Sequence, residues 1–341
     1  MQLNWLGAFS PYDGYGRYSM ALIRSLDRMG VHVTPVTREQ VDAPGWLQRM
    51  AGIDYSRLTI ACLPPYMLAA VPGRQWSLSM TEGSDLPAGW AKTINANCER
   101  VIVPCAANAE TFRAGGVHIP VHVVPGGTCP AEFPRISRNG YREGRPYTFL
   151  ALADRGARKG WTEVWQAFYR AFPETEDVRL IIKARPDREE LFDRVAGAVQ
   201  RDGRVSFWRD DVANVADVYA AADCFAIPSR SEGWGMPMRE AAMMGLPVIT
   251  TRQGGLDDGH TEKWAQVVEG GRAEGIPQHH ENIAGEWFRV DVDELAGRMR
   301  WCYEYPEDAA RRGQKAAQWL RKHQTWGHAA AGLMELIERY G

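Results

Sequence analysis

Strand-like and helix-like segments alternate along almost the whole of this chain, and no other feature of the sequence restricts the fold as strongly. Residues 2–9 read as a buried strand, residues 17–29 as an amphipathic helix with apolar residues at spacings of three and four, and residues 32–36 as the next strand. Successive strands that are joined through a helix lie parallel in one sheet, with right-handed crossovers. The alternation therefore predicts an α/β fold.

A stretch rich in Pro, Gly and Arg interrupts the alternation at residues 126–146 and reads as an inter-domain linker. The chain has 341 residues, more than the size of about 250–300 residues at which a single hydrophobic core stops growing. We therefore expect two domains, residues 1–145 and 146–322, with a cleft between them. Ligands of open α/β sheets bind at the carboxyl ends of the strands, so the loops that follow the strands are where a site is expected.

The remaining expected elements continue the same pattern. Before the linker, the further strands are residues 58–63, 75–80 and 100–103. After it, the strands are residues 147–153, 178–184, 205–208, 223–229 and 247–251, and the helices are residues 161–172, 188–200, 212–222 and 237–244. The tail from residue 292 reads as helical, and its last segment, residues 326–340, is amphipathic.

Composition narrows the class of protein. Apolar residues make up 45% and charged residues 24% of the chain, which excludes a disordered, collagen-like or coiled-coil protein. A net charge of −2 gives no global field that would draw the chain onto nucleic acid or an anionic membrane. The six cysteines show no metal-ligand spacing, and the first residues show no signal-peptide pattern, so we expect reduced thiols in a cytoplasmic protein. No apolar run reaches the length of about 20 residues that spans a bilayer, which leaves peripheral membrane contact open.

The most informative stretch is PSRSEGWGMPMREAAMMG, residues 228–245. An expected strand ends there, a loop with Gly233 and Gly235 follows, and Pro237 stands where a helix starts, a position at which its missing N–H costs nothing. Glycines let the backbone approach a ligand closely, and the free N–H groups at a helix start favour an anion such as phosphate. The stretch therefore predicts a phosphate-binding turn.

Two carboxylates, Glu232 and Glu240, bracket this turn, eight positions apart. Carboxylates accept hydrogen bonds from hydroxyls, so the pair suits a polyol joined to a phosphate. The simpler interpretation is a loop glutamate followed by a glutamate that the helix dipole favours. The spacing resembles the E-x7-E motif of the retaining glycosyltransferases of family 4, which have the GT-B fold.

The resemblance extends over nearly the whole chain. Residues 101–105, 123–127, 245–249 and 285–295 resemble further segments of the family, with Cys105 where the family usually has Ser. It implies two Rossmann-like domains that face each other across a cleft, with C-terminal helices that cross back, so that residues 323–341 pack on the first domain. It also implies that the first glutamate and the amides after it contact the donor sugar and phosphate, and that Glu240 accepts hydrogen bonds from the nucleotide ribose. The first group is Glu232, Gly233, Trp234, Gly235, Met236 and Pro237.

A basic turn, LALADRGARKG at residues 150–160, follows an expected strand. It resembles the family's Arg followed by Lys-Gly, which implies that Arg155 and Lys159 hold the diphosphate. A departing nucleoside diphosphate gains negative charge in the transition state, so fixed cations stabilise that state more than the ground state. The simpler interpretation is a solvated basic loop, and Arg158 is ambiguous.

The first domain offers weaker signals. The loop after residue 9 contains Gly14 and Gly16, and in the family a glycine of this loop approaches the donor phosphates. Glu82 follows another expected strand, where many members of the family have His. Glu82 is a candidate for binding donor or acceptor hydroxyls or for removing the acceptor proton; a glutamate that caps a local turn is the alternative.

Three residues after strands of the second domain are expected to flank the nucleotide base: Lys183, Trp208 and Arg209. For Trp208 a position in the core is an equal alternative. The pair Asp291 and Asp293 resembles a DxD metal motif but precedes an expected helix, so capping is the better interpretation.

The sequence as a whole predicts an enzyme that transfers a sugar from a UDP- or GDP-sugar to a hydroxyl acceptor, and the family resemblance implies retention at the anomeric carbon. Arg155, Lys159, Glu232 and Glu82 are the expected catalytic residues. Because protein cations neutralise the leaving group, no metal and no cofactor are expected; the nucleotide-sugar is a co-substrate. The alternatives are a nucleotide-sugar epimerase of the same fold and a catalytically silent nucleotide-sugar-binding protein. A glycan or lipid-linked acceptor ranks first, a nucleic-acid or protein acceptor stays open, and the oligomeric state is not predicted.

Overall fold

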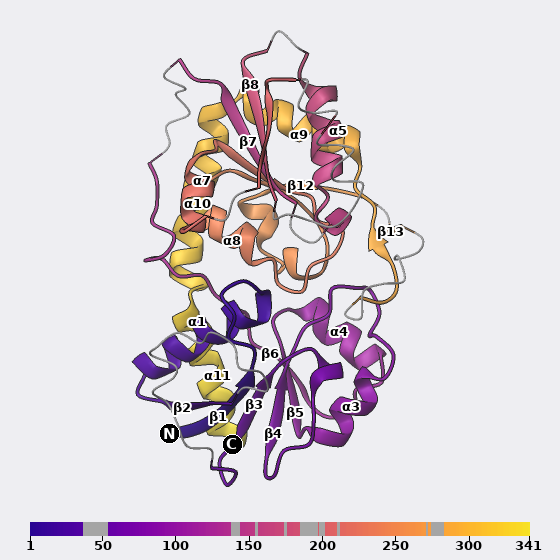
Figure 1. The fold of residues 1–341 in the computed structure, drawn as a ribbon, viewed down its shortest axis with the longest axis vertical. Helices are drawn as coiled ribbons and strands as arrows, with labels where there is room; N and C mark the ends of the chain where they lie inside the picture. The colour runs from indigo at the N-terminus through magenta and orange to yellow at the C-terminus, as the bar shows by residue number, and fades with distance from the viewer. Residues whose placement is uncertain are drawn as a thin grey trace. The chain divides into compact units, whose positions relative to one another are not determined.

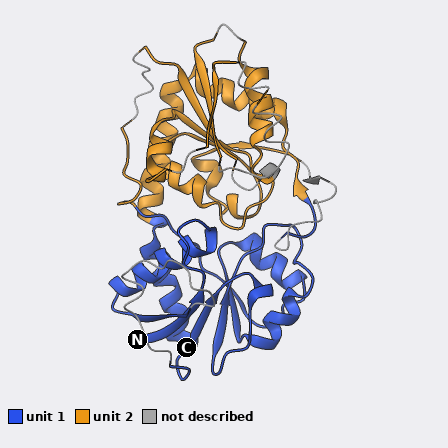
Figure 2. Ribbon diagram, viewed as in Figure 1, with its two compact units in different colours: residues 1–129, 275–286, 323–341 blue, residues 130–274, 287–322 orange. Residues whose placement is uncertain are grey.

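The computed structural model describes residues 1–36, 54–137, 144–153, 156–173, 176–184, 197, 202–209, 212–270, 272–273 and 283–341. The chain divides into two compact units, which Figure 2 shows in blue and orange. Unit 1 comprises Met1–Cys129, Gly275–Glu286 and His323–Gly341, and unit 2 comprises Pro130–Glu274 and Trp287–Lys322.

Unit 1 is built on a six-stranded parallel sheet with the order β2-β1-β3-β4-β5-β6. Its strands are β1 (Gln2–Gly7), β2 (His32–Val36), β3 (Thr59–Cys62), β4 (Gln75–Leu78), β5 (Arg100–Val103) and β6 (Val121–Val123). Its helices are α1 (Gly14–Arg28), η1 (Pro65–Met67), α3 (Trp90–Asn97), α4 (Ala106–Ala114) and α11 (Trp326–Tyr340). The order of the strands reverses at β1, so the loops after β1 and β3 diverge there.

Unit 2 contains a second six-stranded parallel sheet, with the order β12-β11-β10-β7-β8-β9. Its strands are β7 (Tyr147–Leu152), β8 (Val178–Lys183), β9 (Val205–Trp208), β10 (Cys224–Ile227), β11 (Val248–Thr251) and β12 (Gln266–Val268). A separate antiparallel pair is formed by β13 (Arg272–Ala273) and β14 (Trp287–Phe288). The helices are η2 (Gly156–Lys159), α5 (Trp161–Ala171), α7 (Val215–Ala220), α8 (Met236–Met243), η3 (Gly254–Leu256), η4 (Thr261–Lys263), α9 (Val292–Glu304) and α10 (Pro306–His323).

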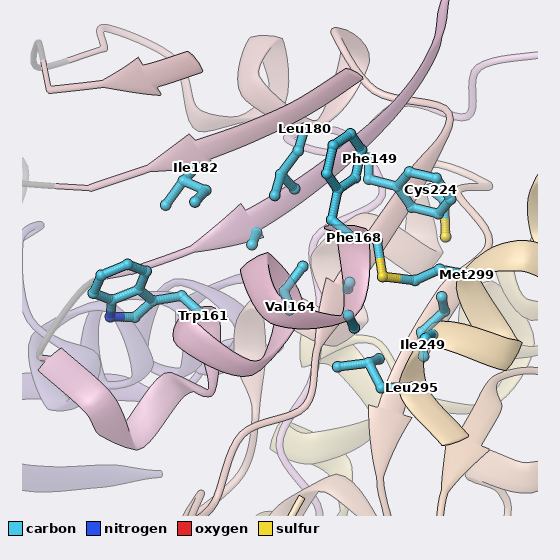
Figure 3. Packing of buried hydrophobic residues seen from close by; sticks show 14 of the residues in the cluster. Phe149, Trp161, Val164, Phe168, Leu180, Ile182, Cys224, Ile249, Leu295 and Met299 are labelled. Carbon is cyan, nitrogen blue, oxygen red and sulfur yellow. The ribbon is translucent and has the colours of Figure 1, made fainter. Parts of the chain in front are cut away.

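Helices cover both faces of the unit 2 sheet (Figure 1), and successive side chains of a strand point to opposite faces. On β7, Phe149 packs into a core with α5 and α9, while its neighbour Leu150 packs into a second core with α7, α8 and α10. Figure 3 shows the first core, where Phe149 and Leu180 of the sheet lie near Phe168 of α5 and Met299 of α9. Both faces of the sheet are therefore covered, which leaves the carboxyl edge of the sheet as the place for a ligand.

The structure places the boundary between the units earlier than expected from the sequence. The expected boundary at 145/146 and part of the expected linker fall inside unit 2, which begins at residue 130. Phe133 is buried in a unit 2 core with its ring 6.1 Å from that of Tyr219, and the Ile136 amide donates to the Met244 carbonyl at 2.9 Å. These two apolar residues attach the segment to unit 2.

The last helix, α11, lies in unit 1, although it follows unit 2 in the chain. The ring of Trp326 packs edge-on against Tyr18 of α1, with the centroids 4.8 Å apart. The Thr128 amide donates to the Gln324 carbonyl at 3.1 Å, next to a bridge between Thr128 and Thr325.

Of the helices within the described residues, none combines the length and the apolar character needed to cross a membrane.

The expected strands are confirmed with ends that differ by at most two residues, and β2, β5, β9 and α11 have the expected bounds. Helix α1 begins at Gly14 and not at residue 17, because the Asp13 side chain accepts a hydrogen bond from the Gly16 amide and so caps the helix earlier. The expected helix at 188–200 lies outside the described residues, apart from residue 197.

Candidate functional site

The candidate site of unit 2 lies where the strand order reverses, between β7 and β10. The sheet runs from β7 through β8 to β9 on one side and from β10 through β11 to β12 on the other. Loops that follow such neighbouring central strands turn to opposite faces of the sheet and leave a crevice at its carboxyl edge, where α/β proteins bind ligands. The two loops here are the ones that the sequence singled out, the turn before Gly160 and the loop after Pro228.

The two loops are held against each other by backbone contacts. Gly160 has a left-handed φ of +69°, and a Cβ atom there would lie 2.1 Å from the Pro228 carbonyl oxygen. The Arg158 carbonyl accepts hydrogen bonds from the Arg230 amide at 2.8 Å and from the Ser229 hydroxyl at 3.0 Å. Only glycine fits at position 160, so the residue after Lys159 sets how closely the basic turn approaches the other loop.

Three charged side chains meet at this carboxyl edge of the sheet and are buried. The Lys159 ammonium donates to the Glu232 carboxylate, and a guanidinium nitrogen of Arg158 lies 3.6 Å from the same carboxylate oxygen. Arg158 also donates to the Ser231 carbonyl, which fixes its position. Burial raises the pKa of the Glu232 carboxyl, but the charges of Lys159 and Arg158 lower it by more, so that it lies below its ordinary value. The cluster carries two positive charges and one negative charge, and therefore favours an anion.

Ser231 adds a polar group with no assigned partner. Its side chain is buried, and its Oγ has no hydrogen-bond partner within the described part of the chain. A buried hydroxyl is normally hydrogen-bonded. The Ser231 hydroxyl, which lies next to the charged cluster, therefore indicates a position where a water molecule or a ligand can bind.

Helix α8 begins directly after these residues. Its N-cap is Gly235, in a left-handed conformation with φ +73°, and no side chain caps the helix. Pro237 stands in the first turn, where it removes an N–H that the helix would not use. Met236 and Pro237 are half-buried, whereas Glu232, Gly233, Trp234 and Gly235 are buried. The helix start thus presents backbone N–H groups without a side-chain acceptor of its own.

Glu240 lies in the interior of α8 and is buried. Its carboxylate accepts a hydrogen bond of 2.9 Å from the Tyr219 hydroxyl of α7. The sequence predicts that this carboxylate binds ribose hydroxyls, which remains a prediction; in the structure one of its oxygens is bonded to Tyr219.

Sequence reasoning missed the loop that follows β11. The Gly255 amide donates to the Glu232 carbonyl at 2.8 Å, and a Cβ atom at Gly255 would lie 2.3 Å from the Gly233 carbonyl oxygen. Asp258, to which the sequence assigned no role, forms a buried ion pair of 2.9 Å with Arg239 of α8. The glycine pair 254–255 just beyond an expected strand was a signal of close backbone packing that could have identified this loop.

The three residues expected near the base lie at the same carboxyl edge, but on the other side of β7 from β10. Lys183 ends β8 and is half-buried, and its ammonium donates to the Ala184 carbonyl at 3.1 Å. Trp208 ends β9 with 36% of its surface exposed, so the interpretation as a core residue is wrong. Arg209 follows it and is exposed.

In unit 1 the corresponding helix start is built differently. Asp13 caps α1, and its carboxylate accepts the Gly16 amide at 2.7 Å. A Cβ atom at Gly16 would lie 2.2 Å from the Ser10 carbonyl oxygen, so this glycine is required by its own loop. Gly14 is exposed. A donor-binding role for Gly14 and Gly16 stays a prediction.

Glu82 is half-buried in the loop after β4, near the buried hydroxyl of Tyr15. That hydroxyl lies 3.1 Å from the Ser79 hydroxyl and accepts the Met80 amide at 3.1 Å. Burial raises the pKa of the Tyr15 hydroxyl, so Tyr15 stays a neutral hydrogen-bonding group. The charge of Glu82 is among those that act on this hydroxyl, a neighbour that the sequence did not indicate.

The remaining predictions concern other parts of the chain. Arg155 lies outside the described residues. Asp291 accepts hydrogen bonds from the amides of Asp293 and Glu294, at 2.9 and 3.0 Å, and so caps α9, as expected. Across the described ranges, His, Cys, Asp and Glu side chains form no group of three suited to a metal ion.

Comparison with known proteins agrees with this geometry. Residues 147–283 match the family model described as "Glycosyl transferases group 1". The chain is 33% identical over 126 residues to a D-inositol 3-phosphate glycosyltransferase of Rhodococcus opacus, covering 30% of this chain and 28% of the relative. It is 27% identical over 158 residues to a GDP-mannose-dependent monoacylated alpha-(1-6)-phosphatidylinositol monomannoside mannosyltransferase of Corynebacterium glutamicum, covering 43% of this chain and 41% of the relative. The chain thus spans less than half the length of each of these relatives.

Solved structures extend the likeness of the fold to both units. Sucrose-phosphate synthase from Thermosynechococcus elongatus matches with a TM-score of 0.71 at 17% identity, covering 99% of this chain and 98% of that chain. Anabaena HepE in complex with UDP and glucose matches with a TM-score of 0.72 at 14% identity, covering 99% of this chain and 100% of that chain. At these identities the likeness concerns the fold, which is the GT-B fold of two α/β units. The sequence match places the likeness to the group 1 glycosyl transferases in residues 147–283 of this chain.

Proposed function

We propose that this protein is a retaining glycosyltransferase that moves a sugar from a nucleotide-sugar to a hydroxyl of an acceptor, without a metal ion. The observation that carries the proposal is the buried cluster of Arg158, Lys159 and Glu232 at the point where β7 and β10 diverge. It stands beside the uncapped start of α8, so two independent sources of positive potential meet at one crevice.

The chemistry follows from charge. When the bond between sugar and phosphate breaks, the leaving diphosphate gains negative charge, and donors that are already in place stabilise that charge without reorganisation. Lys159 and Arg158 are held by Glu232 and by the Ser231 carbonyl, so they are fixed before the substrate arrives. Arg155 is proposed as a further cation. With the leaving phosphate oxygen as the group that takes the acceptor proton, no strong protein base is required and the sugar is transferred on the same face.

Glu232 has two roles in this proposal. One carboxylate oxygen is bound to Lys159, which orients the side chain, and the pKa of the group lies below its ordinary value, so it is an ionised acceptor at neutral pH. An ionised carboxylate accepts hydrogen bonds from sugar hydroxyls. Glu240 is proposed to accept from the ribose and Glu82 to bind a sugar or acceptor hydroxyl.

The donor is proposed to be a UDP- or GDP-sugar. The name of the Corynebacterium relative specifies GDP-mannose, and HepE was crystallised with UDP. The acceptor is proposed to be a glycan or a lipid-linked sugar, in line with the phosphatidylinositol mannoside in the name of that relative. A cytoplasmic location with peripheral membrane contact is proposed on the same basis.

A donor screen tests the proposal. The wild-type protein is incubated with UDP- and GDP-sugars without acceptor, and released nucleotide is measured with and without EDTA, because transferases slowly hydrolyse their donors. We expect release from at least one donor, unaffected by EDTA, and a sugar product whose anomeric proton shows the donor's configuration by NMR. An epimerised sugar would favour the epimerase, and binding without release would favour the silent binding protein; either result would overturn the proposal.

A further inference from the structure

Arg239 of α8 is a fully buried arginine, with 0% of its surface exposed. One guanidinium nitrogen donates to the Trp234 carbonyl and, at 2.9 Å, to the Gly255 carbonyl; another donates to the Asp258 carboxylate at 2.9 Å. The guanidinium plane also lies over the Trp234 ring, 3.7 Å from its centroid. A charge this deep is retained only where its donors are satisfied, so the surroundings of Arg239 are built for it.

The bond to the Trp234 carbonyl fixes the direction of a peptide group at the start of α8. The peptide between Trp234 and Gly235 is trans, so its C=O and its N–H point in opposite directions. Because the C=O points toward the buried guanidinium, the N–H of Gly235 points away from it. Gly235 is the N-cap of α8, and its φ of +73° lies in the left-handed region that glycine adopts without strain.

The other two contacts of Arg239 tie the same loop to the loop after β11. The Gly255 carbonyl and the Asp258 carboxylate both bind Arg239, while the Gly255 amide donates to the Glu232 carbonyl at 2.8 Å. Asp258 is itself held by the His260 amide at 3.0 Å. The positive charge of Arg239 is thereby paired inside the protein, so Arg239 is not itself a phosphate ligand.

We propose that Arg239 is a positioning residue that sets the direction of the Gly235 amide, and through it the affinity of the site for the phosphates of the nucleotide-sugar. This inference rests on the proposed function, since it assigns a determinant of the same site. The predicted consequence is selective: loss of Arg239 weakens the binding of phosphate-bearing ligands and leaves the binding of the nucleoside part unchanged.

The experiment compares three variants with the wild type: Arg239→Met, Arg239→Lys and, as a matched control, Arg204→Met. Arg204 has the same kinds of contact as Arg239: it donates to the Pro173 carbonyl at 2.7 Å, pairs with Asp202 at 2.9 Å, and lies 5.4 Å from the centroid of the Phe168 ring. It differs in position, because it precedes β9 at the opposite edge of the sheet. Dissociation constants are measured by calorimetry for UDP and GDP, and by ligand-observed NMR for uridine and guanosine. Thermal melting is recorded for each variant.

We expect Arg239→Met to raise the Kd of the nucleoside diphosphate by a factor on the order of 10 to 100, with the nucleoside unaffected. Arg239→Lys keeps the charge but not the planar set of donors, so it should also weaken the diphosphate. Arg204→Met should lower the melting temperature without changing either Kd. Unchanged diphosphate affinity in a folded Arg239 variant, or equal loss of nucleoside and diphosphate, would overturn the inference.

Two further results keep the test decisive. If neither Arg239 variant folds, hydrogen exchange of the wild-type segment 230–240 is measured with and without the diphosphate; the inference requires slower exchange there, and unchanged exchange overturns it. If the wild type itself binds neither UDP nor GDP, the proposed function fails and the inference fails with it, whereas wild-type binding that survives loss of Arg239 removes the inference alone.

Discussion

Each unit has a six-stranded parallel sheet, and in each unit a helix starts beside the point where the strand order reverses. The side chains at these two helix starts differ in charge, so the two starts favour ligands of opposite charge. In unit 1, Asp13 is the N-cap of α1, and its carboxylate accepts a hydrogen bond from the Gly16 amide. In unit 2, Gly235 is the N-cap of α8 and no side chain caps the helix, next to the loop that carries Arg158 and Lys159.

The difference shows that the topology supplies a crevice and the side chains decide what binds in it. At α1 the amide is already satisfied and a fixed negative charge stands at the positive end of the helix, so a phosphate would meet repulsion. At α8 the same helix dipole acts together with protein cations. The expected anion site is therefore in unit 2, while the acidic groups of unit 1, Asp13 and Glu82, suit hydroxyl groups.

The largest effect is expected from Lys159→Met. The variant leaves the Glu232 carboxylate buried beside Arg158 at 3.6 Å and removes a fixed cation from the site. Donor hydrolysis, measured as released nucleotide, should fall by about a hundredfold. The free energy of unfolding, measured by denaturant titration, should fall by about 3 kcal/mol, because a buried ion pair loses one partner.

Two controls separate these effects. The double variant Lys159→Met with Glu232→Gln removes both charges of the pair, so it should regain stability but not hydrolysis. Lys315→Met, on an exposed position of α10, should change neither quantity. If the folded Lys159→Met variant hydrolysed the donor as fast as the wild type, the assignment of the anion site to the start of α8 would be wrong.

A smaller effect is expected at the start of α8. Met236 is the first residue of the helix and half-buried, so Met236→Glu places a negative charge where the phosphate is proposed to bind. The Kd of the nucleoside diphosphate should rise about tenfold, whereas the neutral Met236→Gln should leave it within about twofold of the wild type. Since an acidic residue in the first turn stabilises a helix, the melting temperature should not fall. Equal Kd values for the two variants would place the anion elsewhere.

The charge cluster also predicts a dependence of stability on pH. The pKa of Glu232 in the folded protein lies below its ordinary value of 4.5, because the cations outweigh the effect of burial. A depressed folded pKa gives stability that is fully present above the unfolded pKa and is lost as the pH falls through the folded one. The difference in unfolding free energy between wild type and Glu232→Gln should therefore stay constant from neutral pH to about pH 5 and shrink below it.

The comparison with Glu232→Gln is needed because other carboxyls contribute to acid unfolding. Hydrogen bonds from Arg74 and Arg204 lower the pKa values of Glu99 and Asp202, and both groups are present in the two proteins. Their contributions cancel in the difference. A difference that remains constant well below pH 4.5 would mean that Glu232 is not held in the charged form by Lys159 and Arg158.

Much of the fold was predictable because buried strands and their turns carry local signals. Short apolar runs between turn residues gave β2, β5 and β9 with their observed bounds, and the GWG turn before Pro237 marked the start of α8. The basic turn and the glutamate loop could be predicted to meet, because both follow strands whose carboxyl ends share one edge of a parallel sheet.

What could not be predicted depends on contacts between distant residues. Phe133 sits among Gly, Pro and Arg, and only its packing on Tyr219 assigns it to unit 2. An arginine in a helix normally reads as exposed, and the burial of Arg239 is possible only because Asp258, nineteen positions later, pairs with it. Neither local propensity nor periodicity contains that information.

The smallest effect is expected at Asp13, and it tests whether the start of α1 in unit 1 binds phosphate. Asp13→Ala removes the cap of α1 and should lower the free energy of unfolding by about 1 kcal/mol, whereas Asp13→Asn retains a capping oxygen and should lower it by less. In both variants the Kd of the nucleoside diphosphate should stay within about twofold of the wild type, because the anion is proposed to bind at the start of α8 and not at the start of α1. If phosphate instead approached Gly14 and Gly16, removing the carboxylate would relieve repulsion and tighten binding. A clear gain in affinity for Asp13→Asn would therefore assign the phosphate to both helix starts and reduce the difference between the units to one of degree.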